Sequence, residues 1–451
     1  MYLSPLLAGA DVHVEARLLI VLLQLAVIIL VARVFAVLFR KMGQPAVVGE
    51  IAGGLILGPS VLGRMADLPY VGVAWNTVFD PSVGPVFQII SQLGLIFLLF
   101  LIGLEFDFTH LRSHSRAAMS ISVMGIMLPF FIGLALAKWI HPHLERPVDP
   151  RGFALFMGTA MSITAIPILG RMMMEMNITR TRLGAVTIVA AAIDDAFGWI
   201  ILAAVSAMVR ANFHLVQSLK MFALTVAFAL VMMLVVRPVL KAWIRWVMRS
   251  GQGLGLNALA ILFAVIFLCA IVTNLIGIFS IFGAFVLGSV LSDEHEFRQA
   301  VSRQLRSFVT VFFLPIFFTY TGLRTDIGTL HGPLMWSLAL LVSVGAIAGK
   351  FGGCALAARM GGMPWRESGC VGVMMNTRAL MELIVINVGY DLGVIPRSVF
   401  CMLVLMALVT TVMTTPILMR LMRGTELERL VEESGFRRPR SAAAVAAAAV
   451  G

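Results

Sequence analysis

Two adjacent carboxylates, Asp194 and Asp195, lie inside a run from Val189 to Ala203 that otherwise has the composition of a membrane-spanning helix. Each acid at bilayer depth costs about 2.5–3.5 kcal/mol on insertion scales, so two side by side indicate a function, most often in an ion or proton path. The same pair in a soluble protein would be a solvated turn. Neighbouring residues of a helix point about 100° apart. One carboxylate can therefore face a water-filled crevice while the other contacts a partner on another helix.

Lys350 is the only lysine deep within a predicted span, with long apolar or small flanks on both sides. A lysine that reaches the membrane surface by snorkelling would lie nearer a helix end. Lys350 is therefore expected to pair with an aspartate. Such a coupled pair can exchange protons near neutral pH and titrate as one unit.

The predicted spans at residues 152–176 and 366–390 are the ones most interrupted by polar and helix-weakening residues. In the first, Pro167 removes a backbone donor and disfavours helix at Ile166. Two broken helices that cross in the membrane would offer half-helix ends and free carbonyl groups to a cation. The polar residues at the two breaks are Thr159, Ser162, Thr164, Asn376 and Thr377. They can also be ordinary packing residues of membrane helices.

Three further acids and one arginine carry charge within or beside the spans. Arg378 and Glu382 are four residues apart, which permits an ion pair within one helix. This pair either compensates two buried charges or takes part in transport, and the sequence leaves both readings open. Glu50 is expected at the start of a helix, at the membrane interface or as a favourable charge at the helix N-terminus. Glu105 is expected at the protein surface, where its span ends.

Apolar runs of about 17–25 residues predict thirteen transmembrane helices and an all-α polytopic membrane protein. They lie near residues 15–40, 44–63, 85–107, 114–139, 152–176, 181–210, 215–241, 255–275, 277–292, 302–323, 332–360, 366–390 and 396–423. An odd number of helices with buried charge in both halves indicates two inverted six-helix repeats, at about 15–210 and 255–423, joined by a linker helix near 215–241. The whole of 1–423 is thus expected to form one transmembrane domain. Residues 424–451 are expected to form a short cytoplasmic tail that is disordered over its alanine-rich end.

The composition excludes a soluble domain, because 60% of the 451 residues are hydrophobic and 13% are charged. A net charge of +11 can indicate nucleic acid binding, but the arginines lie in short loops between apolar runs, where they set membrane orientation. The excess of Lys and Arg in alternate loops predicts that the N-terminus lies outside and the C-terminus in the cytoplasm. The membrane is expected to be a bacterial inner (plasma) membrane. The four cysteines lack metal or redox spacing and are expected to fill core space.

Four stretches of the sequence together carry a family resemblance. They are Gly49–Gly63 (GEIAGGLILGPSVLG), Phe97–Glu105 (FLLFLIGLE), the helix of the paired aspartates, and Met375–Val385 (MNTRALMELIV). They resemble the second branch of the monovalent cation:proton antiporter superfamily, which includes NapA-like sodium/proton antiporters, Kef-type potassium efflux proteins and plant cation/proton exchangers. The resemblance covers nearly the whole chain, and its motifs are specific to the superfamily rather than to one transported ion.

The resemblance implies a thirteen-helix NhaA/NapA-like fold with a core domain and a dimerisation domain, a homodimer, and elevator-like alternating access. By motif, Asp195 resembles the acid that binds the cation and protons. Asp194 resembles the acid that pairs with a lysine, and Lys350 resembles that lysine. Two acids with a lysine are similar to the electrogenic members, whereas an Asn-Asp pair accompanies electroneutral exchange. The 366–390 helix is closest to the plant exchangers, where potassium is a common substrate, while the paired acids favour sodium.

The sequence therefore predicts a secondary active antiporter that exchanges cytoplasmic Na+ or K+ for external protons and serves pH homeostasis. The cation and protons would compete for Asp195. The chain is not expected to be an enzyme, to use a cofactor or to hold a resident metal. The expected partners are the transported ions, the lipid bilayer and a second copy, with no nucleic acid.

Two alternatives come from other classes of protein. An intramembrane aspartyl protease could use two membrane acids to activate water, but it needs them on facing helices, and here they are adjacent on one. A cation channel would conduct passively without a titrating lysine-aspartate site.

Overall fold

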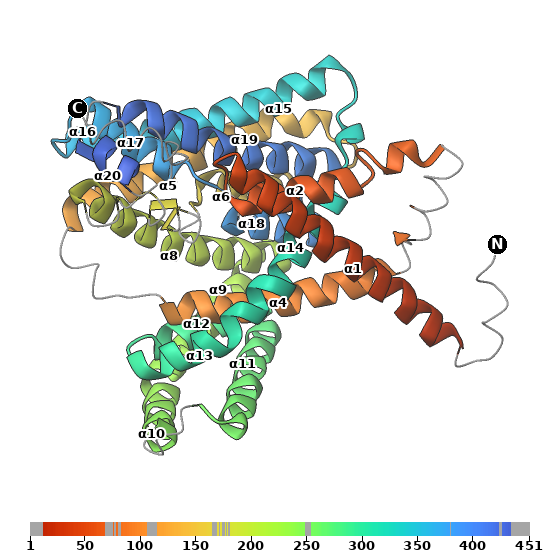
Figure 1. Cartoon of the computed structure of the whole chain (residues 1–451), viewed down its shortest axis with the longest axis vertical. Coiled ribbons are helices and arrows are strands. Elements are labelled where there is room, and N and C mark those ends of the chain that lie inside the picture. Colours follow the sequence, from red (N-terminus) through yellow and green to blue (C-terminus); the bar gives the residue numbers. More distant parts are fainter. Residues whose placement is uncertain are drawn as a thin grey trace, which may run out of the picture. The chain divides into compact units, whose positions relative to one another are not determined.

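The computed structural model describes residues 12–67, 75, 78–79, 83–105, 115–164, 169–170, 172–173, 176, 178, 181–248, 254–378, 380–423 and 426–433. Within these residues the secondary structure is helical and contains no strand (Figure 1). Nine helical segments are long and apolar enough to cross a membrane, and one bent pair would make a tenth over the same residues. The chain is therefore an all-helical integral membrane protein.

The chain divides into two compact units, and each combines segments from both halves of the sequence. The first unit holds the described residues of 1–38, 49–107 and 206–329, and the second holds those of 39–48, 108–205 and 330–451. The α-helices of the first unit are α1 (Val12–Lys41), α2 (Ala46–Leu57), α4 (Gly84–Glu105), α9 (Leu215–Val231), α10 (Arg237–Met248), α11 (Leu256–Ile276), α12 (Ser280–Leu291), α13 (His295–Phe308) and α14 (Leu314–Arg324). Those of the second are α5 (Ser115–Ile140), α6 (Pro150–Ser162), α8 (Arg182–Arg210), α15 (Gly332–Ile347), α16 (Gly353–Met360), α17 (Trp365–Met375), α18 (Leu380–Asp391), α19 (Arg397–Leu421) and α20 (Glu426–Glu433).

Three of the long spans contain one π-helical turn each. These turns are η6 (Met232–Val236) between α9 and α10, η7 (Val309–Phe313) between α13 and α14, and η9 (Ala348–Gly352) between α15 and α16. Single π turns inside α-helices are frequent at functional sites. The turn at η9 is notable because it carries Lys350.

Two predicted spans contain helices that are shorter than predicted. The range 44–63 holds α2 and the range 277–292 holds α12, each of 12 residues. The division between α11 and α12 lies where the sequence places it, because Gly277 ends α11 in a left-handed conformation at φ 102° and bonds Asn274 through its N–H. Helix length alone supports nine or ten spans in the described part of the chain, so the count of thirteen stays a prediction.

Close helix packing in the first unit depends on glycine. A Cβ atom at Gly54 of α2 would lie 2.2 Å from the carbonyl oxygen of Thr319 on α14. The Thr319 hydroxyl donates to the carbonyl oxygen of Glu50 at 3.2 Å. The small residues of α2 therefore serve contact within one chain, as membrane helices use small residues generally.

The second unit contains the helix breaks that the sequence indicates. The helix α6 starts at an Asp149 cap, whose carboxylate accepts from the Gly152 N–H at 2.6 Å, and it ends at Ser162. Ile163 continues in an extended conformation. The helices α17 and α18 are bent by 41° across Asn376 to Arg378 and the following residue. Pro167 and Ile166, to which the sequence assigns the first break, lie outside the described residues.

Candidate functional site

Lys350 and Asp194 form a fully buried ion pair. The Lys350 Nζ lies 2.8 Å from Asp194 Oδ2, and both side chains are completely shielded from solvent. The backbone N–H of Thr164, just after the end of α6, donates to the same oxygen at 2.8 Å. The expected pairing of Lys350 with an aspartate is thus present, and the partner is Asp194.

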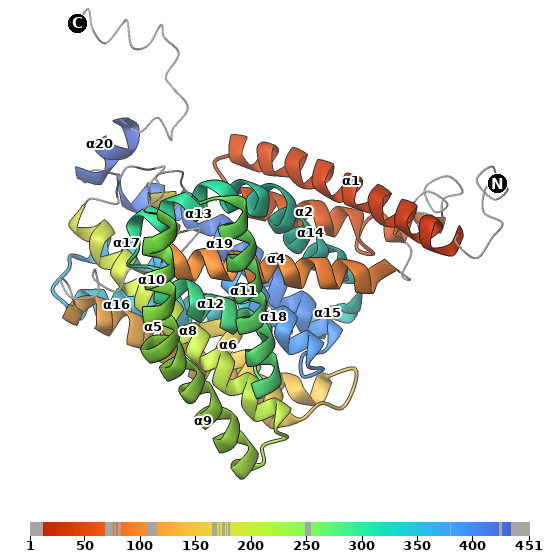
Figure 2. The ribbon, with the colours of Figure 1, turned by 90° about the horizontal axis from the view of Figure 1, so that it is seen from below.

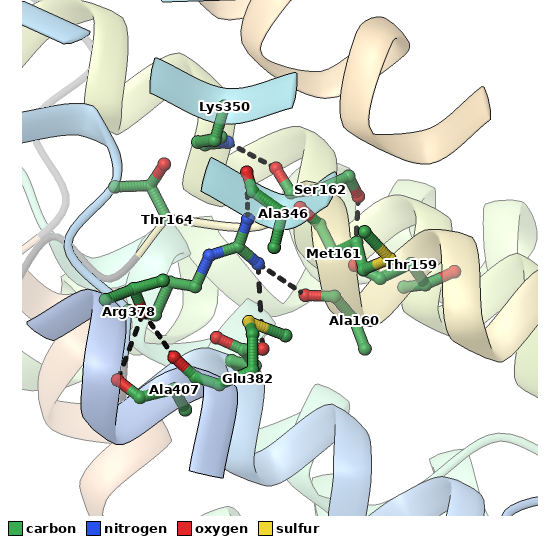
Figure 3. Close-up of polar contacts among 12 residues, drawn as sticks. Thr159, Ala160, Met161, Ser162, Thr164, Ala346, Lys350, Arg378, Glu382 and Ala407 are labelled. Atoms are coloured by element: carbon green, nitrogen blue, oxygen red, sulfur yellow. Dashed lines mark hydrogen bonds and ion pairs between the residues drawn. The ribbon is translucent and has the colours of Figure 1, made fainter. Parts of the chain in front are cut away.

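Two cations cover the carbonyl end of the broken helix α6, which helix geometry leaves unsatisfied. Lys350 donates to the carbonyl oxygen of Ser162. Arg378 donates to Ala160 at 3.0 Å and to Met161 at 2.6 Å (Figure 3). It also reaches Ala346 of α15 at 3.4 Å. The positive charges that the sequence places on two other helices therefore hold the end of α6.

Asp195 has surroundings different from those of its neighbour. Its side chain is 1% exposed. Neither of its carboxylate oxygens has a hydrogen-bond partner that meets normal geometry in the part of the chain that is described. The indole of Trp199, one turn further along α8, lies close to it. A buried carboxylate is unfavourable unless it is paired or coordinated, so Asp195 is poised to take up a positive ion.

The two helix breaks meet in the second unit. The Thr164 hydroxyl donates to the carbonyl oxygen of Met375, the last residue of α17, at 2.9 Å. Arg378 lies within the second break and bonds the end of α6, as described above. Two half-helix ends and their carbonyl groups are thus brought together, which is the arrangement that suits cation binding in a membrane.

The polar side chains at the breaks differ in the hydrogen bonds that they form with the described residues. Thr159 donates to Leu155 at 2.7 Å within α6, and Ser162 donates to the Thr159 carbonyl at 2.9 Å. Thr377 lies 3.4 Å from the hydroxyl of Thr414. The amide of Asn376 is buried, and neither its oxygen nor its nitrogen has a partner among the described residues.

Arg378 and Glu382 are both fully buried and 3.6 Å apart, measured from Nη1 to Oε1. This distance is longer than a hydrogen bond, and neither Glu382 oxygen accepts one within the described residues. The spacing of four residues does bring the two charges together. The short bonds of Arg378 nevertheless go to backbone carbonyls, a role that the sequence did not reveal.

Two further features of the site were missed by sequence reasoning. The Thr411 hydroxyl of α19 donates to the Arg378 carbonyl at 2.9 Å and supports the second break from behind. The signal was present as four threonines, at 410, 411, 414 and 415, in an otherwise apolar span. The π turn around Lys350 was also missed, although glycines crowd that segment.

The expectation for Glu50 is wrong, and the expectation for Glu105 agrees with the structure. Glu50 lies in the second turn of α2, and only 6% of it is exposed. It therefore does not begin its helix, and it is buried because Gly49 and Gly54 let α2 pack closely against its neighbours in the first unit. Glu105 ends α4 with a half-exposed side chain paired with Arg306.

Most of the chain matches one family of known proteins. Residues 26–422 match the model of the family described as "Sodium/hydrogen exchanger, transmembrane". Cation/H(+) antiporter 18 of Arabidopsis thaliana is 36% identical over 91% of this chain and 50% of its own length. The Na(+)/H(+) antiporter NhaS4 of a Synechocystis strain is 36% identical over 90% of this chain and 97% of its own. The K(+)/H(+) antiporter 1 of Saccharomyces cerevisiae is 31% identical over 89% of this chain and 46% of its own length.

The chain thus spans about half the length of the plant and yeast relatives, but nearly all of the cyanobacterial one. Among solved structures, the sodium proton antiporter MjNhaP1 of Methanocaldococcus jannaschii matches with a TM-score of 0.61, over 92% of this chain and 99% of that one. The sequences of these two proteins are 16% identical, so this match establishes a shared fold.

Proposed function

Because the chain belongs to the sodium/hydrogen exchanger family, we propose that it is a secondary antiporter that exchanges Na+ or K+ for protons across a membrane. The family is one of transporters and not of enzymes. Its relatives carry names for both ions, Na+ in the cyanobacterial protein and K+ in the yeast protein. The observation that carries the proposal is the buried carboxylate of Asp195, which accepts no hydrogen bond of normal geometry from the described residues, next to the Lys350–Asp194 pair.

Asp195 is the group for which the cation and the proton compete. A monovalent cation or a proton neutralises the same carboxylate, and both cannot occupy it at once. Movement of the site between the two membrane faces in either neutral form, but not in the empty charged form, couples the two fluxes. Burial supports this restriction, because an uncompensated carboxylate is unfavourable away from water.

The Asp194–Lys350 pair provides a second place for a proton. When Lys350 leaves Asp194, the pair can exchange a proton with water as one coupled unit. A cycle that returns one proton through Asp195 and another through this pair moves two protons for one monovalent cation. The exchange is therefore electrogenic.

The breaks supply the remaining ligands of the cation. The candidates are backbone carbonyls near Thr164 and Thr377, and the amide oxygen of Asn376, which has no hydrogen-bond partner among the described residues. The hydroxyls of Thr159 and Ser162 are bonded within α6 in this conformation, and they support the shape of the break.

The larger architecture is part of the same proposal. The chain has thirteen membrane helices in two inverted repeats, at about 15–210 and 255–423, with a linker helix between them. It forms a homodimer in a bacterial inner membrane, with the N-terminus outside and the C-terminus in the cytoplasm. The fold match to MjNhaP1 supports the helical fold in this proposal.

Reconstitution tests the function directly. Purified protein in liposomes with an acidic interior is exposed in turn to external Na+, Li+, K+ and Rb+, while a pH dye and a voltage dye are read. Antiport predicts that at least one cation dissipates the pH gradient and changes the membrane potential, and that Asp195→Asn abolishes both signals. Cation flux that ignores the pH gradient would instead indicate a channel, and no proton movement with any of the four ions would refute antiport.

A further inference from the structure

A cavity of about 440 Å³ lies in the first unit, and none of the residues proposed to carry ions lines it. It is bounded by Arg210 at the end of α8, by the first turns of α9 and by the end of α11. The last turn of α8, from Ser206, belongs to the first unit. Figure 2 shows α9 and α11 side by side in green. Its volume is within the usual range of ligand pockets, about 300–1,000 Å³. The chain reverses between α8 and α9 through Asn212 and Phe213, both with positive φ.

Two cationic side chains line the cavity. Arg210 and Lys220 line it together with the amide side chain of Gln217. The Arg210 guanidinium lies 4.3 Å from the centre of the Phe279 ring, which holds the side chain in place without neutralising it. No acidic residue lines the cavity, and neither cation has a carboxylate partner in the described part of the chain.

The start of α9 adds to this positive potential. The His214 side chain makes no capping bond there, and the end of a helix where free N–H groups gather carries a partial positive charge. Two cations and a helix N-terminus around one cavity require an anion. A phosphate group suits them, because guanidinium and ammonium groups both bind phosphate oxygens through charge-assisted hydrogen bonds.

Four apolar residues, Met221, Leu224, Leu275 and Ile276, line the same cavity. The surface around it is apolar as well: Leu275 and Val216 are each 80% exposed, and Leu219 is 56% exposed. In a membrane protein such residues suit contact with acyl chains better than contact with water. The cavity therefore combines two cations with apolar residues that an acyl chain can contact.

We propose that this cavity binds an anionic phospholipid. Its phosphate is held by Arg210 and Lys220, and an acyl chain lies along Leu224 and Leu275. No residue of this site takes part in the proposed ion exchange, so the two proposals fail or succeed separately.

The test is native mass spectrometry of the full chain in detergent, titrated with palmitoyl-oleoyl phosphatidylglycerol, with phosphatidylcholine of the same chains, and with inorganic phosphate. The proposal predicts a bound phosphatidylglycerol that phosphatidylcholine does not replace. Each basic residue near an anionic lipid is worth about 1 kcal/mol, or roughly 5-fold in affinity. Arg210→Gln with Lys220→Gln should therefore weaken phosphatidylglycerol binding about 25-fold.

Two matched double variants make the result specific. Arg210→Lys with Lys220→Arg keeps both charges and should keep the preference for phosphatidylglycerol. Arg17→Gln with Lys138→Gln removes two exposed cations elsewhere and should also leave it unchanged. Melting of all variants in detergent shows that each is folded.

Three results would overturn the proposal. One is equal binding of the two lipids, and another is an unchanged preference in the Arg210→Gln, Lys220→Gln protein. The third is binding of inorganic phosphate at the same two residues as strongly as phosphatidylglycerol, which would assign the site to a soluble anion. If a second copy covers this face instead, the dimer will take up no lipid that depends on Arg210, and the lipid site is refuted.

Discussion

At the scale of single residues, the site depends on the difference between two neighbouring aspartates. Asp194 receives Lys350 and a backbone N–H on one oxygen, so its charge is compensated in the buried interior. Asp195 receives no comparable bond within the described residues. The two carboxylates point in different directions from α8, as adjacent helical residues must. The protein therefore holds one carboxylate, and the other is the one that we propose to bind an ion.

Lys350→Ala should destabilise the protein by roughly 3–5 kcal/mol, because it leaves Asp194 as a buried charge without its partner. It should also reduce the current carried per cation, while cation binding changes less. Thermal unfolding in detergent and currents on a solid-supported membrane measure the two effects. Lys138→Ala, which removes an exposed lysine, is the control and should melt like the wild type.

A double variant completes this test. Asp194→Asn combined with Lys350→Ala removes both charges and should recover part of the lost stability. If Lys350→Ala alone melts like the wild type and carries the same current, the pair has no such role.

Asp293, outside the membrane-spanning segments, gives a residue-scale test of pH dependence. Burial raises the pKa of its carboxyl. Hydrogen bonds and charge from Lys241 and Arg237 lower the pKa by more than burial raises it, so the net pKa lies below its ordinary value. The stabilisation from this pairing is therefore complete above the unfolded pKa, near 4, and is lost as the pH falls through the folded value. The side chain is 48% exposed, so solvent screening limits the effect to about 1 kcal/mol or less.

The expected result is that Asp293→Asn melts slightly below the wild type at pH 7 and that the difference shrinks as the pH falls below about 4. Melting curves of both proteins across this range measure it. A difference that grows on acidification would have the wrong sign for this pairing.

At the scale of elements, the central feature is that α6 ends inside the second unit with its carbonyls held by side chains from other segments. Arg378 and Lys350 both reach this end, and Thr164 ties the following residues to α17. A membrane helix can stop at this depth only where neighbouring groups satisfy its backbone. The end of α6 is therefore stabilised by Arg378 and by the same lysine that pairs with Asp194.

Substitution of Arg378 should lower the stability of the protein more than substitution of Glu382, although the two residues form one buried pair. Arg378→Met removes the donors to Ala160 and Met161 and leaves Glu382 without its counter-charge, so a loss of roughly 3–5 kcal/mol is expected. Glu382→Gln removes an acid that accepts no hydrogen bond in the described residues and should cost much less. Unfolding of the two single variants and of the double variant measures the asymmetry. Equal losses would mean that the pair acts as a simple ion pair and not as a helix cap.

At the scale of the whole molecule, the sequence predicts what depends on apolar length and intramembrane charge. The long apolar runs identify α1, α4, α5, α8, α11 and α19 closely. The rarity of charge in the spans marks Asp194, Asp195 and Lys350 as a group, and the structure brings Lys350 to Asp194.

What the sequence did not predict depends on contacts between distant segments. The sequence predicts an interfacial Glu50 because it does not show which distant helices pack around this residue. In the structure those helices bury it. The capping role of Arg378 needs the end of α6 beside it, more than 200 residues earlier in the chain. The π turn at Lys350 likewise has no periodic signal, since one extra residue in a turn barely changes a hydrophobic pattern.

We propose that one carboxylate, Asp195, binds a cation and a proton in turn. Titration calorimetry of the purified protein with the transported cation, at pH 6, 7 and 8 and in buffers of different ionisation enthalpy, tests it most directly. The account predicts that each bound cation releases a proton from the protein and that the apparent affinity falls as the pH is lowered, by up to about tenfold per unit. Asp195→Asn should lose this binding while remaining folded. An affinity that is the same at all three pH values, or one that persists in Asp195→Asn, would contradict the account.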